Sequence, residues 1–141
     1  MADKKIELRV IAPTQATTKS PYKYRKNVDM VILRCTTGEL GVLPGRVPCS
    51  MVLDLGILRV FDEDKEVHMA VMGGIAHVNN DVVTVLSDSA QWPEDIKVDE
   101  VTKTLETLER KVSETDNILE KSSYRDDFRR CKIQLELAEK Q

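Results

Sequence analysis

The sequence has little of several things that would assign it to a class at once. Only six of its 141 residues are aromatic, so any buried core is built mainly from valine, leucine, isoleucine and methionine. No run approaches the ~18 consecutive apolar residues of a membrane-spanning helix. The polar first five residues argue against a secretion signal, and a formal net charge of −3 argues against a general nucleic-acid binder. These absences predict a soluble intracellular protein.

Side chains that carry chemistry are also scarce. Cys35, Cys49 and Cys131 stand far apart without a Cys-x-x-Cys pair, which fits neither a disulfide framework nor a zinc cage. His68 and His77 fall in alternating apolar stretches without neighbouring ligands, so we expect ordinary sheet residues and no metal site. Nucleophile-elbow, zinc-helix and phosphate-loop motifs are missing. We therefore expect no catalytic residue and no cofactor, and a reactive Cys49 is the one enzyme hypothesis left open.

Residues 1–92 show a hydrophobic period of two, which is typical of strands with one buried face. The alternating or β-branched runs are residues 6–10, 28–33, 57–61, 67–71, 75–78 and 82–86. Two of the intervals between them, residues 62–65 and 79–81, have the polar composition of tight hairpin turns. Short strands at close spacing predict an antiparallel β-sandwich or barrel, and we take the sandwich as the expected fold.

Residues 93–141 show a helical period instead. One stripe has spacings of four, three and four and consists of Val101, Leu105, Leu108 and Val112. A second stripe consists of Tyr124, Phe128, Cys131, Leu135 and Ala138. Each stripe lies on one helix face, and Asp99 stands where an N-cap is expected. The two stripes predict an antiparallel helical hairpin, so the whole chain is expected to be α+β, mainly β.

Basic residues gather on the second predicted helix. They are Arg125, Arg129, Arg130 and Lys132. A solvated helix face explains such a cluster, and so does a surface that meets an acidic partner. The sequence leaves both interpretations open.

Residues 38–48 (GELGVLPGRVP) combine three glycines and two prolines with leucine and valine. Glycine permits unusual backbone angles, and proline reduces the entropy lost on ordering. The segment is either a turn packed on its own sandwich or a stiff apolar docking loop, which binds at little ordering cost.

At this segment the sequence resembles a known family, the epsilon subunit of bacterial F-type ATP synthase, called delta in mitochondria. The similarity covers essentially the whole chain. It runs through residues 38–45 (GELGVLPG), 55–60 (LGILRV), 71–74 (VMGG), 82–86 (VVTVL) and 135–140 (LELAEK). The chain departs from the family at Arg46, where histidine is usual, and at Cys49, where leucine is usual.

The resemblance implies a non-catalytic rotor subunit whose sandwich binds the gamma subunit and the ring of membrane-embedded c subunits. The residues that it assigns to this docking are Glu39, Leu40, Val42, Leu43, Pro44 and Arg46. It also implies a hairpin that inhibits ATP hydrolysis, with the four basic residues near the beta subunits and the alpha subunits close by. The implied location is peripheral, on the cytoplasmic face of a bacterial cell membrane, without insertion and without nucleic acid.

Some members of the family bind ATP between the tail helices, but the matching positions here are Thr102, Lys103 and Gln134. Without the family's arginine forks the bidentate phosphate contacts are lost, so we expect no useful ATP binding. A different class of function also remains open, namely an adaptor unrelated to ATP synthase that binds partner helices through its tail.

Overall fold

A computed structural model describes residues 4–12 and 22–139 of the chain. The chain divides into two compact units, Met1–Ala90 and Gln91–Gln141. The change of hydrophobic period placed the boundary two residues later, after residue 92. Lys140, the last residue of the tail motif, lies outside the described part.

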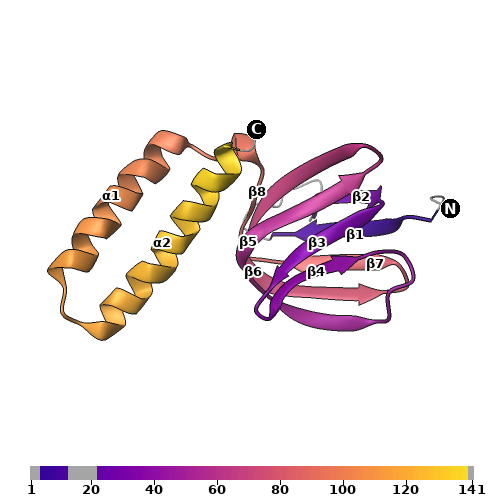
Figure 1. The fold of residues 1–141 in the computed structure, drawn as a ribbon, viewed down its shortest axis with the longest axis horizontal. Helices are drawn as coiled ribbons and strands as arrows, with labels where there is room; N and C mark the ends of the chain where they lie inside the picture. Colours follow the sequence, from indigo (N-terminus) through magenta and orange to yellow (C-terminus); the bar gives the residue numbers. More distant parts are fainter. Residues whose placement is uncertain (1–3, 13–21, 140–141) are drawn as a thin grey trace. The chain divides into compact units, whose positions relative to one another are not determined.

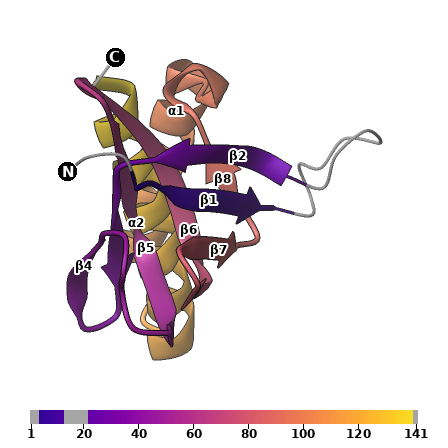
Figure 2. The same cartoon turned by 90° about the vertical axis from the view of Figure 1, so that its right-hand side faces the viewer.

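The first unit is a mainly β structure of eight strands in the described part, seen in Figures 1 and 2. The strands are β1 (Ile6–Ile11), β2 (Tyr22–Val28), β3 (Met30–Cys35), β4 (Gly38–Val42), β5 (Cys49–Asp62), β6 (Lys65–Asn79), β7 (Val82–Leu86) and β8 (Ala90–Gln91). They hydrogen-bond in the order β2-β1-β7-β6-β5-β3-β4, and β8 pairs with β6. The mainly β first unit expected from the sequence is confirmed.

One strand pair differs from the expected antiparallel arrangement. β1 and β7 are parallel, with Leu8 opposite Val83 and Val10 opposite Val85, whereas β1 and β2 are antiparallel. Figure 2 shows β1 between β2 and β7. The pairing joins strands more than seventy residues apart in sequence. Hydrophobic periodicity shows which face of a strand is buried but not which distant strand it pairs with, so it does not predict this parallel pairing.

The two predicted hairpin turns are confirmed. Glu63 has a φ of 57°, and Asn80 and Asp81 have φ values of 52° and 61°. These are left-handed conformations, which asparagine and aspartate tolerate better than most residues. The turns set the register of β5 with β6 and of β6 with β7.

Some strand limits were predicted wrongly. Residues 28–33 are not one strand, because the chain bends at Asp29 between β2 and β3. The carboxylate of Asp29 accepts a hydrogen bond from the Glu63 N–H at 2.6 Å, and its own N–H donates to the Phe61 carbonyl at 2.9 Å. Conversely, residues 67–71 and 75–78 belong to the single strand β6, which continues through Gly73 and Gly74.

The sandwich core is aliphatic, as the shortage of aromatics predicted. In β1 the inward residues Ile6, Leu8 and Val10 are fully buried, and they alternate with partly exposed residues. Within the described residues the buried hydrophobic set contains no phenylalanine, tyrosine or tryptophan. Alternating burial of this kind is the consequence of the period-two pattern.

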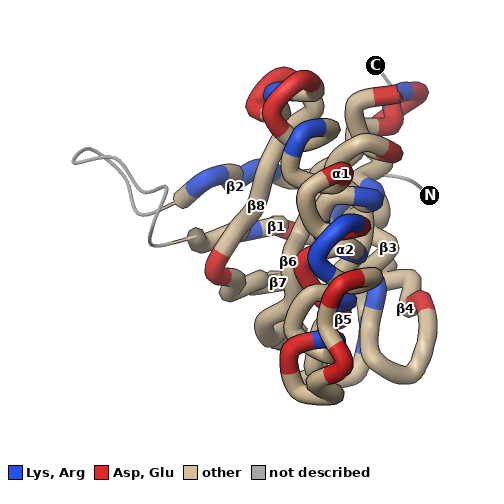
Figure 3. The backbone as a smooth tube through the Cα atoms, turned by 90° about the vertical axis from the view of Figure 1, so that its left-hand side faces the viewer, with Lys and Arg blue, Asp and Glu red and all other residues tan. Residues whose placement is uncertain are grey.

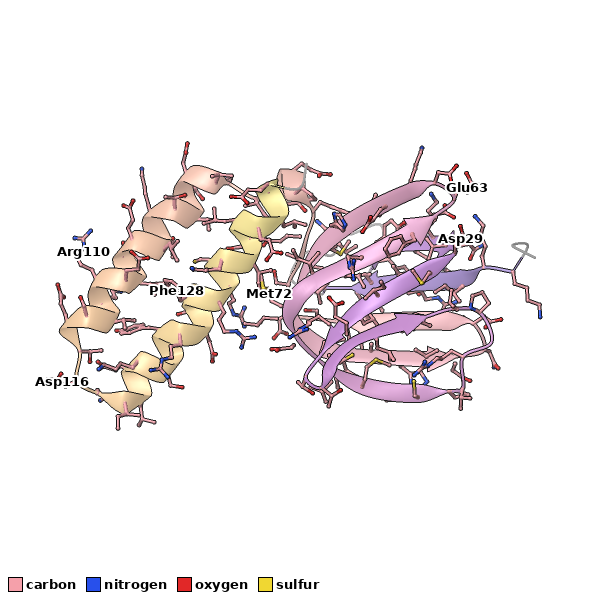
Figure 4. The ribbon with its side chains drawn as sticks, viewed as in Figure 1. Asp29, Glu63, Met72, Arg110, Asp116 and Phe128 are labelled. Atoms are coloured by element: carbon pink, nitrogen blue, oxygen red, sulfur yellow. The ribbon has the colours of Figure 1, made fainter. Side chains whose placement is uncertain are left out.

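The second unit consists of the short 3-10 helix η2 (Pro93–Asp95) and the helices α1 (Val98–Glu114) and α2 (Ile118–Glu139). α1 and α2 lie side by side and antiparallel (Figure 1), which confirms the hairpin. Leu108 and Cys131 are buried, and Phe128 lies between the helices (Figure 4). Neither helix in the described part is long and apolar enough to cross a membrane.

Two details of the hairpin differ from expectation. Lys97, not Asp99, is the N-cap of α1, because the Lys97 carbonyl accepts the Val101 N–H at 3.0 Å. Asp99 instead lies in the first turn, where its charge still favours the positive end of the helix dipole. The stripes also missed Leu137, which is fully buried although it lies off the second stripe.

Candidate docking surfaces

The loop between β4 and β5, residues 43–48, presents apolar side chains on a fixed backbone. We call it the docking loop. Leu43 and Val47 are 56% and 75% exposed. Gly45 has a φ of 85°, and its N–H donates to Asp81 Oδ1 at 2.7 Å. This bond ties the docking loop to the β6–β7 turn, which reduces the conformational entropy that the loop would lose at binding.

The structure separates the six predicted docking residues into exposed and buried positions. Leu43, Arg46 and Glu39 are exposed, and Leu40 and Pro44 are half-buried. Val42 has no exposed surface, because it faces inward from β4 opposite the equally buried Val31. Val42 is therefore a core residue in this structure, and its assignment to a contact surface is corrected. Residues 38–42 of the segment 38–48 form strand β4. Successive side chains of a strand point to opposite faces, and this decides which of them are exposed.

Glu39 has a partner that the sequence did not reveal. Its Oε2 accepts a hydrogen bond from Arg59 Nη2 at 3.1 Å, from β4 across β3 to β5. Arg34, opposite Glu39 in the ladder, lies over Gly56, where a Cβ would come within 2.6 Å of its side chain. Glu39 is thus presented as part of an ion pair, and Arg59 belongs to the same surface.

An exposed apolar row crosses three neighbouring strands of the sandwich. It consists of Val52, Ile75 and Leu86, which are 59%, 53% and 47% exposed. Val52 is opposite Ile75 on β5 and β6, and Ile75 is opposite Leu86 on β6 and β7, so all three point to one face. Ile11, opposite Leu86, extends this apolar row onto β1. Contiguous exposed apolar surface of this kind marks an interaction site more often than isolated exposed residues do.

Polar groups border the apolar row on the same face. His77 Nδ1 and Ser50 Oγ, from paired positions of β6 and β5, are 2.8 Å apart. Further along, Glu7 Oε1 accepts from Arg25 Nε at 3.1 Å and Glu7 Oε2 accepts from Arg9 Nε at 2.6 Å. These hydrogen bonds, that from Arg25 most, hold the pKa of Glu7 below its usual value. An apolar strip with a charged and hydrogen-bonded border is the usual anatomy of a protein interface.

The helical tail carries the second candidate surface. Arg125, Arg129 and Lys132 are exposed at positions i, i+4 and i+7 of α2, which places them on one side of the helix. We call these three residues the basic face. Arg130 lies about 100° further around the helix, so the predicted cluster of four divides into three plus one. Figure 3 shows Lys and Arg as blue segments along the helical hairpin.

Comparison with known proteins agrees with both the fold and the motifs. Residues 5–93 match the family described as ATP synthase, Delta/Epsilon chain, beta-sandwich domain. The chain belongs to that family. It is 39% identical over 111 residues to the ATP synthase epsilon chain of Synechococcus sp. (strain RCC307), covering 79% of this chain and 78% of the relative. It is 30% identical over 131 residues to the chloroplastic epsilon chain of Solanum lycopersicum, covering 93% and 94%.

A solved structure supports the same relationship over nearly the full length. A chain of the Euglena gracilis mitochondrial ATP synthase, in a structure of OSCP, F1 and c-ring, matches with a TM-score of 0.74 and 26% identity. The match covers 96% of this chain and 84% of the Euglena chain. These matches confirm the resemblance to the epsilon subunit. An epsilon chain is a non-catalytic subunit of ATP synthase. The alternative of an adaptor unrelated to ATP synthase is set aside.

The positions that match the ATP-binding motif of some epsilon chains are Thr102, Lys103 and Gln134. Gln134 Nε2 donates to Gln91 Oε1 at 2.7 Å, so its amide is already engaged within the second unit. Thr102 is half-buried, and Lys103 is exposed, with its carbonyl accepting from Thr107 Oγ1 at 2.9 Å. None of these three side chains offers the planar two-donor fork that grips a phosphate. Absence of ATP binding stays a prediction.

The remaining chemistry-bearing residues lie in structural positions. His68 and His77 are both in β6, and His68 Nε2 is 2.9 Å from Glu66 Oε1. Across residues 4–12 and 22–139, no group of three or more His, Cys, Asp or Glu side chains is placed to hold a metal ion. Cys35 and Cys131 are buried, which raises the pKa of each thiol. Cys49 is half-buried at the start of β5.

Proposed function

We propose that this non-catalytic subunit joins the gamma subunit to the c-ring in the central stalk of an ATP synthase and that its helical hairpin restrains ATP hydrolysis. The chain lies on the cytoplasmic face of a bacterial cell membrane, attached through its partners and not inserted. The observation that carries the docking part is the apolar surface of the sandwich, made by the docking loop and the apolar row.

This surface suits a permanent attachment. Leu43, Val47 and Ile75 are each more than half exposed, and burying such a side chain completely contributes roughly 1.5–3 kcal/mol. The docking loop is pinned by its hydrogen bond to Asp81, so little ordering entropy is lost at binding. The apolar surface is therefore the part assigned to the gamma subunit.

A group of charges on the sandwich suits the c-ring. Glu39 and Arg59 stand side by side as an exposed ion pair, and Arg46 in the docking loop adds a second exposed guanidinium. Such a group of charges matches the polar loops of a membrane-embedded ring better than an apolar patch does, because rim charges set register and orientation. Arg46 replaces the usual histidine, so this chain presents a permanent charge there.

The hairpin suits a reversible role. One apolar stripe on each helix holds the two helices together, and Leu108 and Cys131 are the buried members of these stripes. The three residues of the basic face are exposed, and acidic segments of the beta subunits, with the alpha subunits beside them, would attract them. A surface contact of this kind is weak and salt-dependent, which suits a restraint that engages and releases.

The test of the restraint is ATP hydrolysis by the cognate complex, assembled with the full chain or with a chain that ends at Asp95. We expect faster hydrolysis with the shortened chain, at equal incorporation of both forms. Equal rates with both forms stably bound would contradict an inhibitory hairpin and leave the sandwich as the functional part.

The test of the docking surface is binding of full-length variants to the isolated gamma subunit. Leu43→Asp places a charge in the apolar contact and should weaken binding at least about tenfold, because an unpaired charge is costly to bury. Val67→Asp, an exposed aliphatic of β6 near the β5–β6 turn, is the matched control. Equal affinities for Leu43→Asp and the unchanged protein would mean that the gamma subunit binds elsewhere.

A further inference from the structure

The outer end of the hairpin exposes two large aliphatic residues. Ile118 and Leu119 begin α2 and are 81% and 80% exposed. Asn117 Oδ1 accepts the Leu119 N–H at 2.9 Å, and Thr115 Oγ1 donates to Glu120 Oε2 at 2.6 Å. These caps hold the turn in one conformation, near Asp116 in Figure 4. Polar residues would serve a helix start equally well, so the fold itself gives no reason for two aliphatics here.

Helix geometry distinguishes the two residues. At about 100° per residue, Arg125, Arg129 and Lys132 come within about 40° of Ile118 around the axis, because they follow it by 7, 11 and 14 positions. Leu119 points about 100° away from Ile118. Ile118 therefore extends the basic face toward the hairpin tip, whereas Leu119 does not.

The extended face is continuous and positively charged. Lys121 lies about 60° from Ile118 and adds a further basic group, and Ser122 fills the next position. Glu136, in line with Ile118 one turn beyond Lys132, ends the positive region. From Ile118 to Lys132 the face is about 21 Å long, at 1.5 Å per residue.

We propose that Ile118 is the apolar anchor of the surface through which α2 binds an acidic segment of a partner subunit. This inference rests on the proposed function of the hairpin and adds an apolar contact at the hairpin tip. The partner presents carboxylates to Arg125, Arg129 and Lys132, and an aliphatic pocket about 10 Å before the first of them. Charges accelerate and orient such an encounter, while the buried aliphatic group slows its dissociation.

A second copy of this chain does not satisfy the same face. Two basic faces brought together would oppose Arg125, Arg129 and Lys132 to like charges, which is unfavourable. Of the acidic groups near the tip, Glu120 lies about 160° from Ile118 around α2, and Glu114 and Asp116 precede α2, so none lies on this face. The complementary surface therefore belongs to a different, acidic chain.

The test compares two full-length cysteine variants, Ile118→Cys and Leu119→Cys, which are matched in exposure and position. Maleimide labelling at each site is measured by mass spectrometry in the free chain and in the assembled ATP synthase complex. We expect similar rates in the free chain, and at least tenfold slower labelling of Ile118→Cys alone in the complex. Equal labelling at both sites in the complex would overturn the proposal.

A second pair of variants separates anchoring from steering. In the complex, Ile118→Ser should weaken hydrolysis inhibition about tenfold without altering its salt dependence, and Leu119→Ser should leave it unchanged. Arg129→Gln should lower the salt dependence itself, because it removes a long-range attraction. Slow labelling of Ile118→Cys in a complex whose ATP hydrolysis rate is the same with and without the hairpin would support the contact at Ile118 and reject the inhibitory function. Identical inhibition by Ile118→Ser and Leu119→Ser would reject the anchor alone.

Discussion

Gly74 is the backbone position on which the shape of the sandwich face depends most directly. It has a φ of 116°, and a Cβ built there would lie 2.0 Å from the Leu86 carbonyl oxygen. It immediately precedes Ile75, the central residue of the apolar row. Gly74→Ala would therefore strain the chain and push β6 from β7 where the apolar row crosses both strands.

The loss of stability in Gly74→Ala has two sources, the backbone strain at this φ and the close approach of the Cβ to the Leu86 carbonyl oxygen. A side chain held at such a φ costs roughly 1–3 kcal/mol. Relieving a 2.0 Å approach to a backbone atom requires a strand shift, and losing one or two ladder hydrogen bonds costs about 1 kcal/mol each. We expect Gly74→Ala to lower the free energy of unfolding of the sandwich by about 2–5 kcal/mol.

Two other glycines provide controls for the separate terms. Gly45 has a φ of 85° but open space around a Cβ, so Gly45→Ala should cost only the strain, roughly 1–3 kcal/mol. Gly41 has neither a positive φ nor a close neighbour, so Gly41→Ala should change stability by no more than about 0.5 kcal/mol. Urea unfolding, followed by the sheet amide signals of the full chain, measures all three. Equal stability of the Gly74 and Gly41 variants would refute the reasoning.

Three further predictions concern an ion pair, pH and the hairpin. Arg59→Gln should weaken c-ring attachment, measured by retention of the chain on isolated c-rings, because it releases Glu39 from its 3.1 Å contact. The 2.6 Å hydrogen bond from Lys5 holds the pKa of Asp62 below its usual value. Its contribution to the free energy of unfolding should therefore be complete above the pKa of Asp62 in the unfolded chain. It should be lost on acid titration below about pH 4. The same bond raises the pKa of Lys5, so its contribution should be lost only as the pH rises through that raised value. Cys131→Ser should loosen the hairpin by about 1 kcal/mol, since it buries a hydroxyl, and amide hydrogen exchange in both helices measures this.

Sequence reasoning reached the elements whose signal is local. Residues 82–86 were predicted as a strand and form β7, and the helical stripes predicted Leu108 and Cys131 as contacts. The glycines and prolines of residues 38–48 predict a loop, whereas residues 38–42 form strand β4. Alternation within that strand buries Val42 and exposes Leu43, a difference of one position that composition does not resolve.

The parts of the site that were missed depend on pairing between distant strands. Val52, Ile75 and Leu86 each look like ordinary strand residues, and only the register of β5, β6 and β7 aligns them. The Glu39–Arg59 contact similarly spans two strand pairings. A shift of one residue in register would move each of these side chains to the opposite face, so no local pattern encodes the surface.

The proposed function assigns permanent attachment to the sandwich and reversible attachment to the hairpin. The sandwich surface assigned to the gamma subunit is apolar and tied down at Gly45, so its binding depends on buried area, which salt scarcely weakens. The basic face of α2 acts through charges at the solvent boundary, whose attraction falls within a Debye length of ~8 Å at physiological ionic strength. Raising salt should therefore release the hairpin while the sandwich stays bound. The proposed function needs this separation. If release of the hairpin also released the sandwich, the central stalk would lose its connection to the c-ring.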